Sequence, residues 1–237
     1  MLLHIIRHAD PDYSVDSITP RGVDEAKALA DRMSRRPIDG LYTSPLGRAI
    51  ATAEPVGHAL GMQPVVLDWA HEFSSPLVDD GVGRTGLAFW NVAGQYVRGG
   101  DLDLERPDSF PLYLEGEAGT LIAAEVERVR EGSDRWLASI GVSRDGGVYR
   151  LADKVPGEVA VVCHGGLGVT WVAHLLGLPV GLAWCGLFVA PTSVTTVAFE
   201  TRSPGIAVPR VIALGDTSHI YAAGLAENRS GFPGDFG

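Results

Sequence analysis

Short apolar runs alternate along this chain with longer segments whose apolar residues recur at helical spacing. The runs predict strands of a buried sheet, at residues 2–6, 40–43, 63–69, 158–164, 193–200 and 207–215. The longer segments predict helices, at residues 19–36, 44–61, 117–140 and 165–177. This alternation is typical of an α/β fold, and we expect three layers, α/β/α, around a mostly parallel central sheet.

Local signals support three of these helices. Thr19 and Ser44 are each followed by proline, the order expected of an N-cap and a first helical position. Pro55 then falls inside the second helix, where a kink is expected. In the helix at 117–140, helical spacing predicts one inner face: Leu121, Val126, Val129, Trp136, Leu137 and Ile140.

Two stretches break the alternating pattern. Residues 73–115 contain Gly, Pro, Ser and scattered aromatic residues without regular spacing, and we interpret them as an irregular insertion or lid over the site. Residues 222–237, which are rich in Gly, are predicted to form a loose tail. A chain of 237 residues is long enough to bury one sizeable core, so we expect a single domain over 1–237.

Composition restricts the class of protein. Hydrophobic residues make up 46% of the chain and charged residues 20%, as in a soluble globular protein. The net charge of −10 argues against a nucleic-acid partner, which needs a basic surface. No apolar run is long enough to span a membrane, and no signal peptide is recognised. With only two cysteines, Cys163 and Cys185, we expect a cytoplasmic protein with reduced thiols.

Residues able to do chemistry follow four of the predicted strands. They are Arg7 with His8, Ser44 with Arg48, His71 with Glu72, and His164. In a parallel α/β sheet the carboxyl ends of the strands meet at one edge, where ligands bind. We therefore expect these side chains to line a single pocket.

That pocket is predicted to be cationic although the protein is acidic. Two helices, after Ser44 and after His164, are expected to begin at this edge and to offer unpaired N–H groups. Together with Arg7 and Arg48, these groups favour a phosphoryl group over a carboxylate as ligand.

Three motifs, in this order, carry a resemblance to a known family: IIRHAD at 5–10, TSPLGRAIATA at 43–53 and VVCHGG at 161–166. With a glutamate after the third strand, they are similar to those of the histidine phosphatase superfamily, also called the phosphoglycerate mutase-like family. The resemblance covers residues 1–72 and 117–220, outside the irregular insertion. It implies the phosphoglycerate mutase-like fold and a phosphomonoesterase that acts on a small phosphorylated metabolite without a metal or other cofactor.

The resemblance also implies a role for each motif residue. His8 would be the nucleophile that becomes phosphohistidine, and Glu72 the proton donor. The other motif residues would hold the phosphoryl group and stabilise its charge, with His164 taking a catalytic part: Arg7, Arg48, His164 and Gly165.

Some residues depart from the family pattern. Ala9 stands where the usual first motif has glycine, which bears on the conformation of the loop after His8. Residues 73–81, FSSPLVDDG, lack the Arg-His-Tyr-Gly sequence that follows the matching glutamate in phosphoglycerate mutases, and this favours a phosphatase. Asp79 or Asp80 is an alternative to Glu72 as proton donor. Asp216 and His219 are interpreted as caps of the fold.

Several alternatives stay open. Phosphoglycerate mutase-type transfer is one, and a non-catalytic binding module is another. A metal-dependent hydrolase would draw on common metal ligands: His8, Asp10, Asp12, His71, His164, Asp216 and His219. The sequence does not specify which phosphorylated substrate binds, and it leaves the oligomeric state open, a homodimer included. We expect selectivity to reside in residues 73–115 and in the tail.

Overall fold

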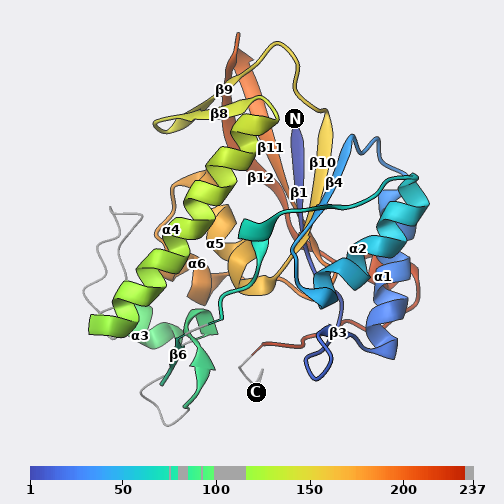
Figure 1. The fold of residues 1–237 in the computed structure, drawn as a ribbon, viewed down its shortest axis with the longest axis vertical. Coiled ribbons are helices and arrows are strands. Elements are labelled where there is room, and N and C mark those ends of the chain that lie inside the picture. Colours follow the sequence, from blue (N-terminus) through green and yellow to red (C-terminus); the bar gives the residue numbers. More distant parts are fainter. Residues whose placement is uncertain (75, 80–84, 92, 99–115, 233–237) are drawn as a thin grey trace.

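A mixed eight-stranded sheet forms the centre of the molecule (Figure 1). The computed structural model describes residues 1–74, 76–79, 85–91, 93–98 and 116–232. The strands cross the sheet in this order: β5 (Val65–Val66), β4 (Gly40–Thr43), β10 (Glu158–Cys163), β1 (Leu2–Arg7), β11 (Val194–Ser203), β12 (Ile206–Asp216), β9 (Val148–Leu151) and β8 (Val142–Asp145). The first four are parallel to one another, and the remaining pairs are antiparallel.

Helices cover both faces of this sheet (Figure 1). One face carries α1 (Pro20–Met33) and α2 (Gly47–Leu60), and the other carries α4 (Gly116–Ser139), α5 (Gly165–Leu176) and α6 (Val180–Gly186). Successive residues of β1 divide between the two layers, because side chains alternate along a strand. Leu3 and Ile5 belong to the core that includes α4 and α5, whereas Ile6 packs with α1 and α2. The expected α/β fold is confirmed, and its parallel half carries the candidate site.

Shorter elements complete the described chain. They are β2 (Pro11–Asp12), β3 (Ser17–Ile18), the 3-10 turns η1 (Asp68–Ala70) and η2 (Phe89–Asn91), β6 (Leu77–Val78), β7 (Leu87–Ala88), α3 (Gly94–Arg98) and α7 (Ser218–Ala222). Within the predicted insertion, β6 and β7 pair as a hairpin. Residues 75, 80–84, 92 and 99–115 of that segment lie outside the described residues.

One predicted helix feature is confirmed in the structure, and two others differ. The Thr19 side chain caps α1 by accepting the Gly22 N–H at 3.1 Å, as predicted. Helix α2, however, begins at Gly47 instead of Ser44, because the Ser44 hydroxyl is hydrogen-bonded to His164 and does not cap the helix. On α4, Leu121 is 46% exposed and the neighbouring Ile122 is fully buried in its place.

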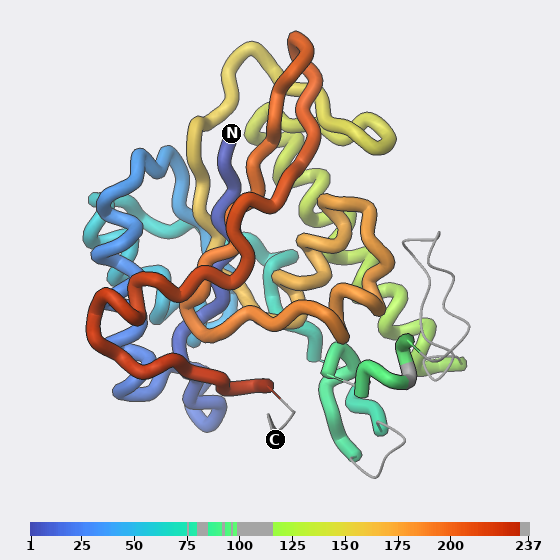
Figure 2. Tube along the Cα trace, turned by 180° about the vertical axis from the view of Figure 1, so that it is seen from behind, coloured from blue at the N-terminus to red at the C-terminus, as the bar shows by residue number. Residues whose placement is uncertain are grey.

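The start of the predicted tail is anchored to α1. After α7 the chain runs back past α1 (Figure 2). Asn228 is buried there and donates hydrogen bonds to Asp10 at 2.9 Å and to Glu25 at 2.8 Å. Asn228 therefore links this segment to α1 and to the loop after His8, and the predicted loose tail continues to residue 237, outside the described residues.

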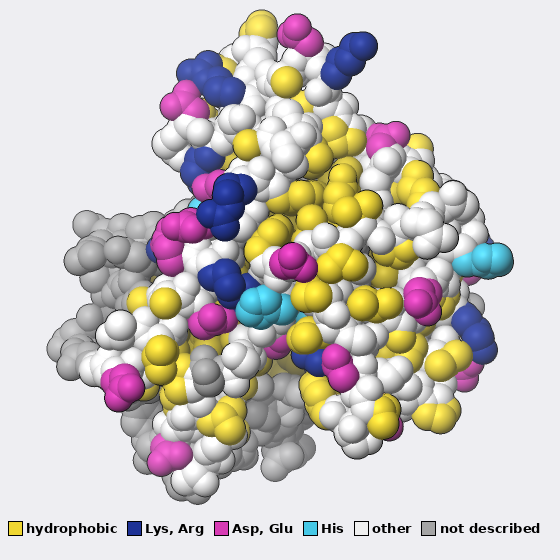
Figure 3. All heavy atoms as spheres, viewed as in Figure 1, with side chains coloured by type: hydrophobic (Ala, Val, Ile, Leu, Met, Phe, Trp, Pro, Cys, Tyr) yellow, Lys and Arg dark blue, Asp and Glu magenta, His cyan; other side chains and the backbone are white. Residues whose placement is uncertain are grey.

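The outer face of α4 is polar, as expected of a helix with one buried side. Figure 3 shows Lys, Arg, Asp and Glu side chains mixed along it, and many of them form ion pairs one turn apart, such as Arg135 with Glu131 at 2.9 Å. Within the described parts of the chain, no helix combines the length and apolar character that a membrane crossing requires.

Candidate active site

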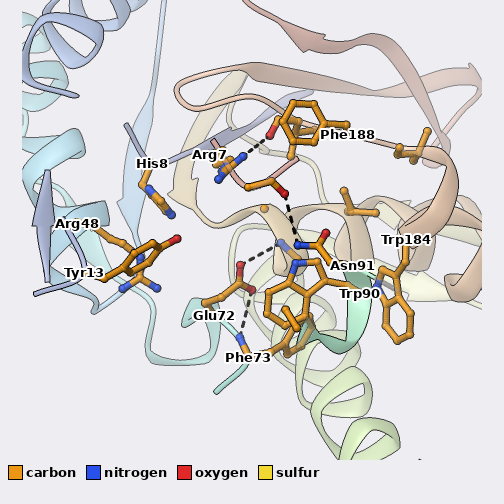
Figure 4. Close-up of a pocket in the computed structure, with 17 residues that line it drawn as sticks. Arg7, His8, Tyr13, Arg48, Glu72, Phe73, Trp90, Asn91, Trp184 and Phe188 are labelled. Carbon is orange, nitrogen blue, oxygen red and sulfur yellow. Dashed lines mark hydrogen bonds between the residues drawn. The ribbon is translucent and has the colours of Figure 1, made fainter. Parts of the chain in front are cut away.

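A cavity of about 280 Å³ opens at the carboxyl ends of the parallel strands (Figure 4). The predicted residues among its lining are Arg7, His8, Arg48, Glu72 and Gly165. The rest of the described lining was not predicted as a set: Tyr13, Phe73, Ala88, Trp90, Asn91, Gly166, Val169, Trp184, Leu187, Phe188, Val189 and Gly231. The sheet topology thus brings the separate motifs to one place, although three side chains that were also expected in the pocket are not in the described lining: Ser44, His71 and His164.

His8 is buried at the end of β1, with one ring nitrogen fixed. Its Nδ1 atom lies 2.7 Å from the carbonyl oxygen of Ala9. Because a carbonyl can only accept, Nδ1 must carry the proton, and the lone pair of the neutral ring is on Nε2. Burial, reinforced by the charge of Arg7, lowers the pKa of His8 to about 3. The ring is therefore neutral at ordinary pH and has a nucleophilic nitrogen available.

His164, at the end of β10, lies beside His8, with ring centroids 5.1 Å apart. Its Nε2 atom is 2.7 Å from the Ser44 hydroxyl, while its buried Nδ1 has no hydrogen-bond partner among the described residues. Burial and the neighbouring His8 and arginines lower the pKa of His164 well below its usual value. A bound dianion would oppose this effect, because negative charge favours the protonated ring.

Arg7 is fixed by contacts with Val189 and Phe188, and its Nε–H has no partner among the described residues. Its Nη1 atom donates to the carbonyl oxygen of Val189 at 2.9 Å, and the guanidinium lies over the ring of Phe188. Its Nε–H is buried without a partner in the described structure. An anion in the cavity would supply the missing acceptor.

Arg48 is oriented by Asp16, a residue that sequence reasoning missed. Asp16 Oδ1 lies 2.6 Å from Arg48 Nη1, and Asp16 Oδ2 accepts the Gly47 N–H at 2.7 Å. Asp16 has φ 47°, an uncommon value for a residue other than glycine. Arg48 Nε, like that of Arg7, is buried and unpaired among the described residues.

Glu72 is partly buried where α5 begins. Its carboxylate accepts the N–H groups of Gly166 at 3.0 Å and Leu167 at 2.9 Å, and that of Phe73 at 3.2 Å. Burial raises the pKa of Glu72, although these three hydrogen bonds oppose the shift. A raised pKa is what a proton donor requires.

The expectation of free helix N-termini was wrong at several positions. The first N–H of α2 is bonded to Asp16, and two N–H groups of α5 are bonded to Glu72. The helix ends thus hold the protein's own carboxylates. The positive charge that faces the cavity comes from the arginines.

The loop after His8 does not require glycine. Ala9 is fully buried and has no positive φ, and its N–H donates to Thr52 Oγ1 at 3.0 Å. Thr52 belongs to the second motif and bonds in turn to the Arg48 carbonyl at 2.7 Å. The alanine in the first motif is therefore compatible with this loop.

Several other candidates lie away from the cavity. Asp216 pairs with Arg32 at 2.8 Å, and His219 Nε2 lies 3.1 Å from Thr192 Oγ1, so both join elements of the fold. Asp79 is not in the described lining, and Asp80 lies outside the described residues. The described residues include no group of three or more His, Cys, Asp or Glu side chains placed to hold a metal ion.

The family comparison agrees with the motifs. The model of the histidine phosphatase superfamily (branch 1) matches residues 3–76, which include Arg7, His8, Arg48 and Glu72. Over this region the chain is similar to the histidine phosphatase superfamily, as its motifs predicted. Over 81 residues the chain is 35% identical to "Putative phosphoserine phosphatase 2" of Hydrogenobacter thermophilus; this match covers 30% of the chain and only 40% of that relative.

Solved structures share the fold over nearly the whole chain. A mutant phosphoserine phosphatase of Entamoeba histolytica, in complex with phosphoserine, has a TM-score of 0.61 and 18% identity over 92% of this chain and 98% of that one. A mycobacterial glucosyl-3-phosphoglycerate phosphatase has a TM-score of 0.60 and 23% identity, covering 91% and 99%. YhfR of Bacillus stearothermophilus has a TM-score of 0.59 and 22% identity, covering 92% and 98%. At these identities the likeness shows the phosphoglycerate mutase-like fold.

Proposed function

We propose that this protein is a phosphomonoesterase in which His8 Nε2 accepts the phosphoryl group of a small substrate. The observation that carries the proposal is the hydrogen bond from His8 Nδ1–H to the Ala9 carbonyl, which leaves Nε2 as the nucleophile. The buried Nε–H groups of Arg7 and Arg48, which have no partner among the described residues, lie in the same site and suit the oxygens of the transferring group.

Two displacements complete the proposed reaction. In the first, the Nε2 lone pair attacks phosphorus, the bond to the leaving oxygen breaks, and protonated Glu72 gives its proton to that oxygen. In the second, Glu72 takes a proton from water, the water oxygen attacks phosphorus, and the N–P bond breaks to release inorganic phosphate. Arg7, Arg48 and His164 stabilise the charge on the phosphoryl oxygens in both steps.

Residues of the predicted insertion form part of the cavity wall, so the proposal includes a role for this segment. Its described residues Phe73, Ala88, Trp90 and Asn91 line the cavity together with Gly231 of the carboxyl-terminal segment. We propose that residues 73–115 act as a lid of a single domain and exclude water from the phosphoryl group.

The test is a screen of phosphomonoesters combined with trapping of the phosphoenzyme. We expect release of phosphate and a phosphoenzyme that is labile to acid, as phosphohistidine is. His8→Ala should abolish both, while His58→Ala, on the exposed face of α2, should leave both intact. Turnover that survives in His8→Ala would refute the proposal. Loss of turnover on chelation would favour the metal-dependent hydrolase, and isomerisation of phosphoglycerate without hydrolysis would favour the mutase.

A further inference from the structure

We infer that the substrate's leaving group is uncharged and largely apolar, and that it binds against the aromatic wall made by Trp90, Trp184 and Phe188. This inference rests on the proposed function, because it assigns the part of the substrate that lies beyond the phosphoryl group. Figure 4 shows these three residues on the side of the cavity away from Arg48.

The charges in the cavity are already required by the reaction. Among the described lining residues the cations are Arg7 and Arg48, and the single acid is Glu72. Both arginines are next to His8, where the phosphoryl group must bind. A carboxylate on the leaving group, such as phosphoserine or phosphoglycerate carries, would meet no further cation in this lining and would lie near Glu72. Burying an unpaired charge is costly, so such substrates should be disfavoured.

The rings of the aromatic wall are held by contacts with other residues. The Trp184 indole N–H donates to Thr170 Oγ1 at 2.8 Å, so its ring offers only carbon to the cavity. Trp90 packs against Phe73, with ring centroids 5.3 Å apart, and against Phe89 at 4.9 Å. Phe188 also contacts the ring of Phe232, with centroids 5.1 Å apart. Rings held in this way lose little conformational entropy when an apolar group packs on them.

The volume of the cavity further limits the class of substrate. Its volume of about 280 Å³ is at or below the lower end of the roughly 300–1,000 Å³ found for ligand pockets. A phosphoryl group with one aromatic ring or a short branched chain fits that size better than a nucleotide. The inferred substrates are therefore small aryl or alkyl phosphates.

Matched substrates test the inference directly. Phenyl phosphate and 4-carboxyphenyl phosphate differ by one carboxylate, and we expect kcat/KM to be at least tenfold higher for phenyl phosphate. O-Phosphoserine and 3-phosphoglycerate should be similarly poor. Equal or higher kcat/KM for the carboxylated member would overturn the inference while leaving the proposed phosphatase activity in place.

Binding measurements test the inferred pocket independently of the proposed catalytic activity. Calorimetry with phenylphosphonate and 4-carboxyphenylphosphonate needs no turnover, and we expect the uncharged phosphonate to bind at least tenfold more tightly. If no ester is hydrolysed but this ratio holds, the proposed function fails and the inferred pocket stands. If the ratio is absent, the inferred pocket fails.

A charge placed on the wall supplies a gain-of-function check. Leu187→Lys adds a cation to the lining, and it should raise the relative kcat/KM or affinity of the carboxylated member at least fivefold. Leu182→Lys adds the same charge to the neighbouring helix α6 outside the described lining and should not change the ratio. Equal effects of the two variants would show that general electrostatics, and not the wall, set the preference.

Discussion

The indole ring of Trp90 occupies the space that a side chain on Gly166 would need. A Cβ atom on Gly166 would lie 2.6 Å from Trp90 Cε2, closer than any normal contact. The same glycine donates its N–H to Glu72. The glycine of the third motif thus lets an aromatic side chain of the insertion pack against the start of α5, next to the N–H that bonds to the proposed proton donor.

Gly166→Ala should therefore destabilise the protein, because the methyl group must displace Trp90. Overpacking of this kind costs about 1–3 kcal/mol, and we expect a loss in that range in urea unfolding. The matched control is Gly168→Ala on the same helix, whose Cβ would lie 3.4 Å from Ile5 and so nearly fits. If the two variants had equal free energies of unfolding, the tight contact between residue 166 and Trp90 would not limit stability.

Ser44 is predicted to position His164. Ser44→Ala removes the hydrogen bond to His164 Nε2 and leaves that ring free to turn, so the rate of phosphoenzyme formation should fall about tenfold, the effect of roughly 1.4 kcal/mol. The measurement is single-turnover phosphorylation alongside the thermal midpoint. Ser34→Ala, at the exposed end of α1, is the control and should change neither. A rate loss explained wholly by lower stability would argue against a positioning role.

Asp16 is predicted to act through Arg48. In Asp16→Ala the guanidinium loses its partner and its fixed orientation, so KM for a phosphomonoester should rise about tenfold, with a smaller change in kcat. Asp12→Ala is the control, because Asp12 lies in the same hairpin but bonds to Ser14. An unchanged KM in Asp16→Ala would mean that Arg48 needs no such support.

The sequence predicted the site better than it predicted the contacts that hold the site together. Arg7, His8, Arg48 and Glu72 could be found because parallel strands deliver their ends to one edge, and each motif marks a strand end. Asp16 could not be found in this way. It comes from a hairpin after β1, and its ion pair with Arg48 depends on a left-handed backbone conformation at Asp16 that the local sequence does not indicate.

Secondary structure shows the same division between local and distant causes. Helix α1 was predicted closely because its cap and its apolar spacing lie within the segment itself. The start of α2 was misplaced because Ser44 bonds to His164, which is distant in sequence. The aromatic wall was also not predicted as a unit, since Trp90 lies in the insertion, whereas Trp184 belongs to α6 and Phe188 to the loop just after it.

Glu72 predicts a characteristic dependence of rate on pH and leaving group. The acid must be protonated for the first step, and its raised pKa keeps it so to higher pH than an ordinary glutamic acid. The rate for phenyl phosphate should therefore fall as pH rises through this pKa. Glu72→Gln should slow hydrolysis of phenyl phosphate at least a hundredfold, and of 4-nitrophenyl phosphate much less, because its leaving oxygen needs little protonation. Equal losses for the two substrates would exclude Glu72 as the acid.

His219 predicts a loss of stability in acid that is separate from catalysis. Burial and the nearby charge of Arg32 lower its pKa to about 4, although Asp216 acts in the opposite direction. The unfolded chain has an ordinary histidine pKa near about 6.5, so between these values it binds a proton that the folded protein does not. The free energy of unfolding therefore falls as pH drops from about 6.5 to 4, by at most about 1.4 kcal/mol per pH unit from this group.

Replacing His219 isolates that contribution. His219→Gln can keep a hydrogen bond to Thr192 but does not titrate, so its unfolding free energy should depend less steeply on pH between 4 and 6.5. His8 and His164 also have lowered pKa values and act in the same direction in both proteins, which leaves the difference to His219. Urea unfolding at a series of pH values gives the slopes, with the exposed His58→Gln as control. Parallel slopes for wild type and His219→Gln would mean that His219 is already protonated in the folded protein, and that Arg32 does not keep it neutral.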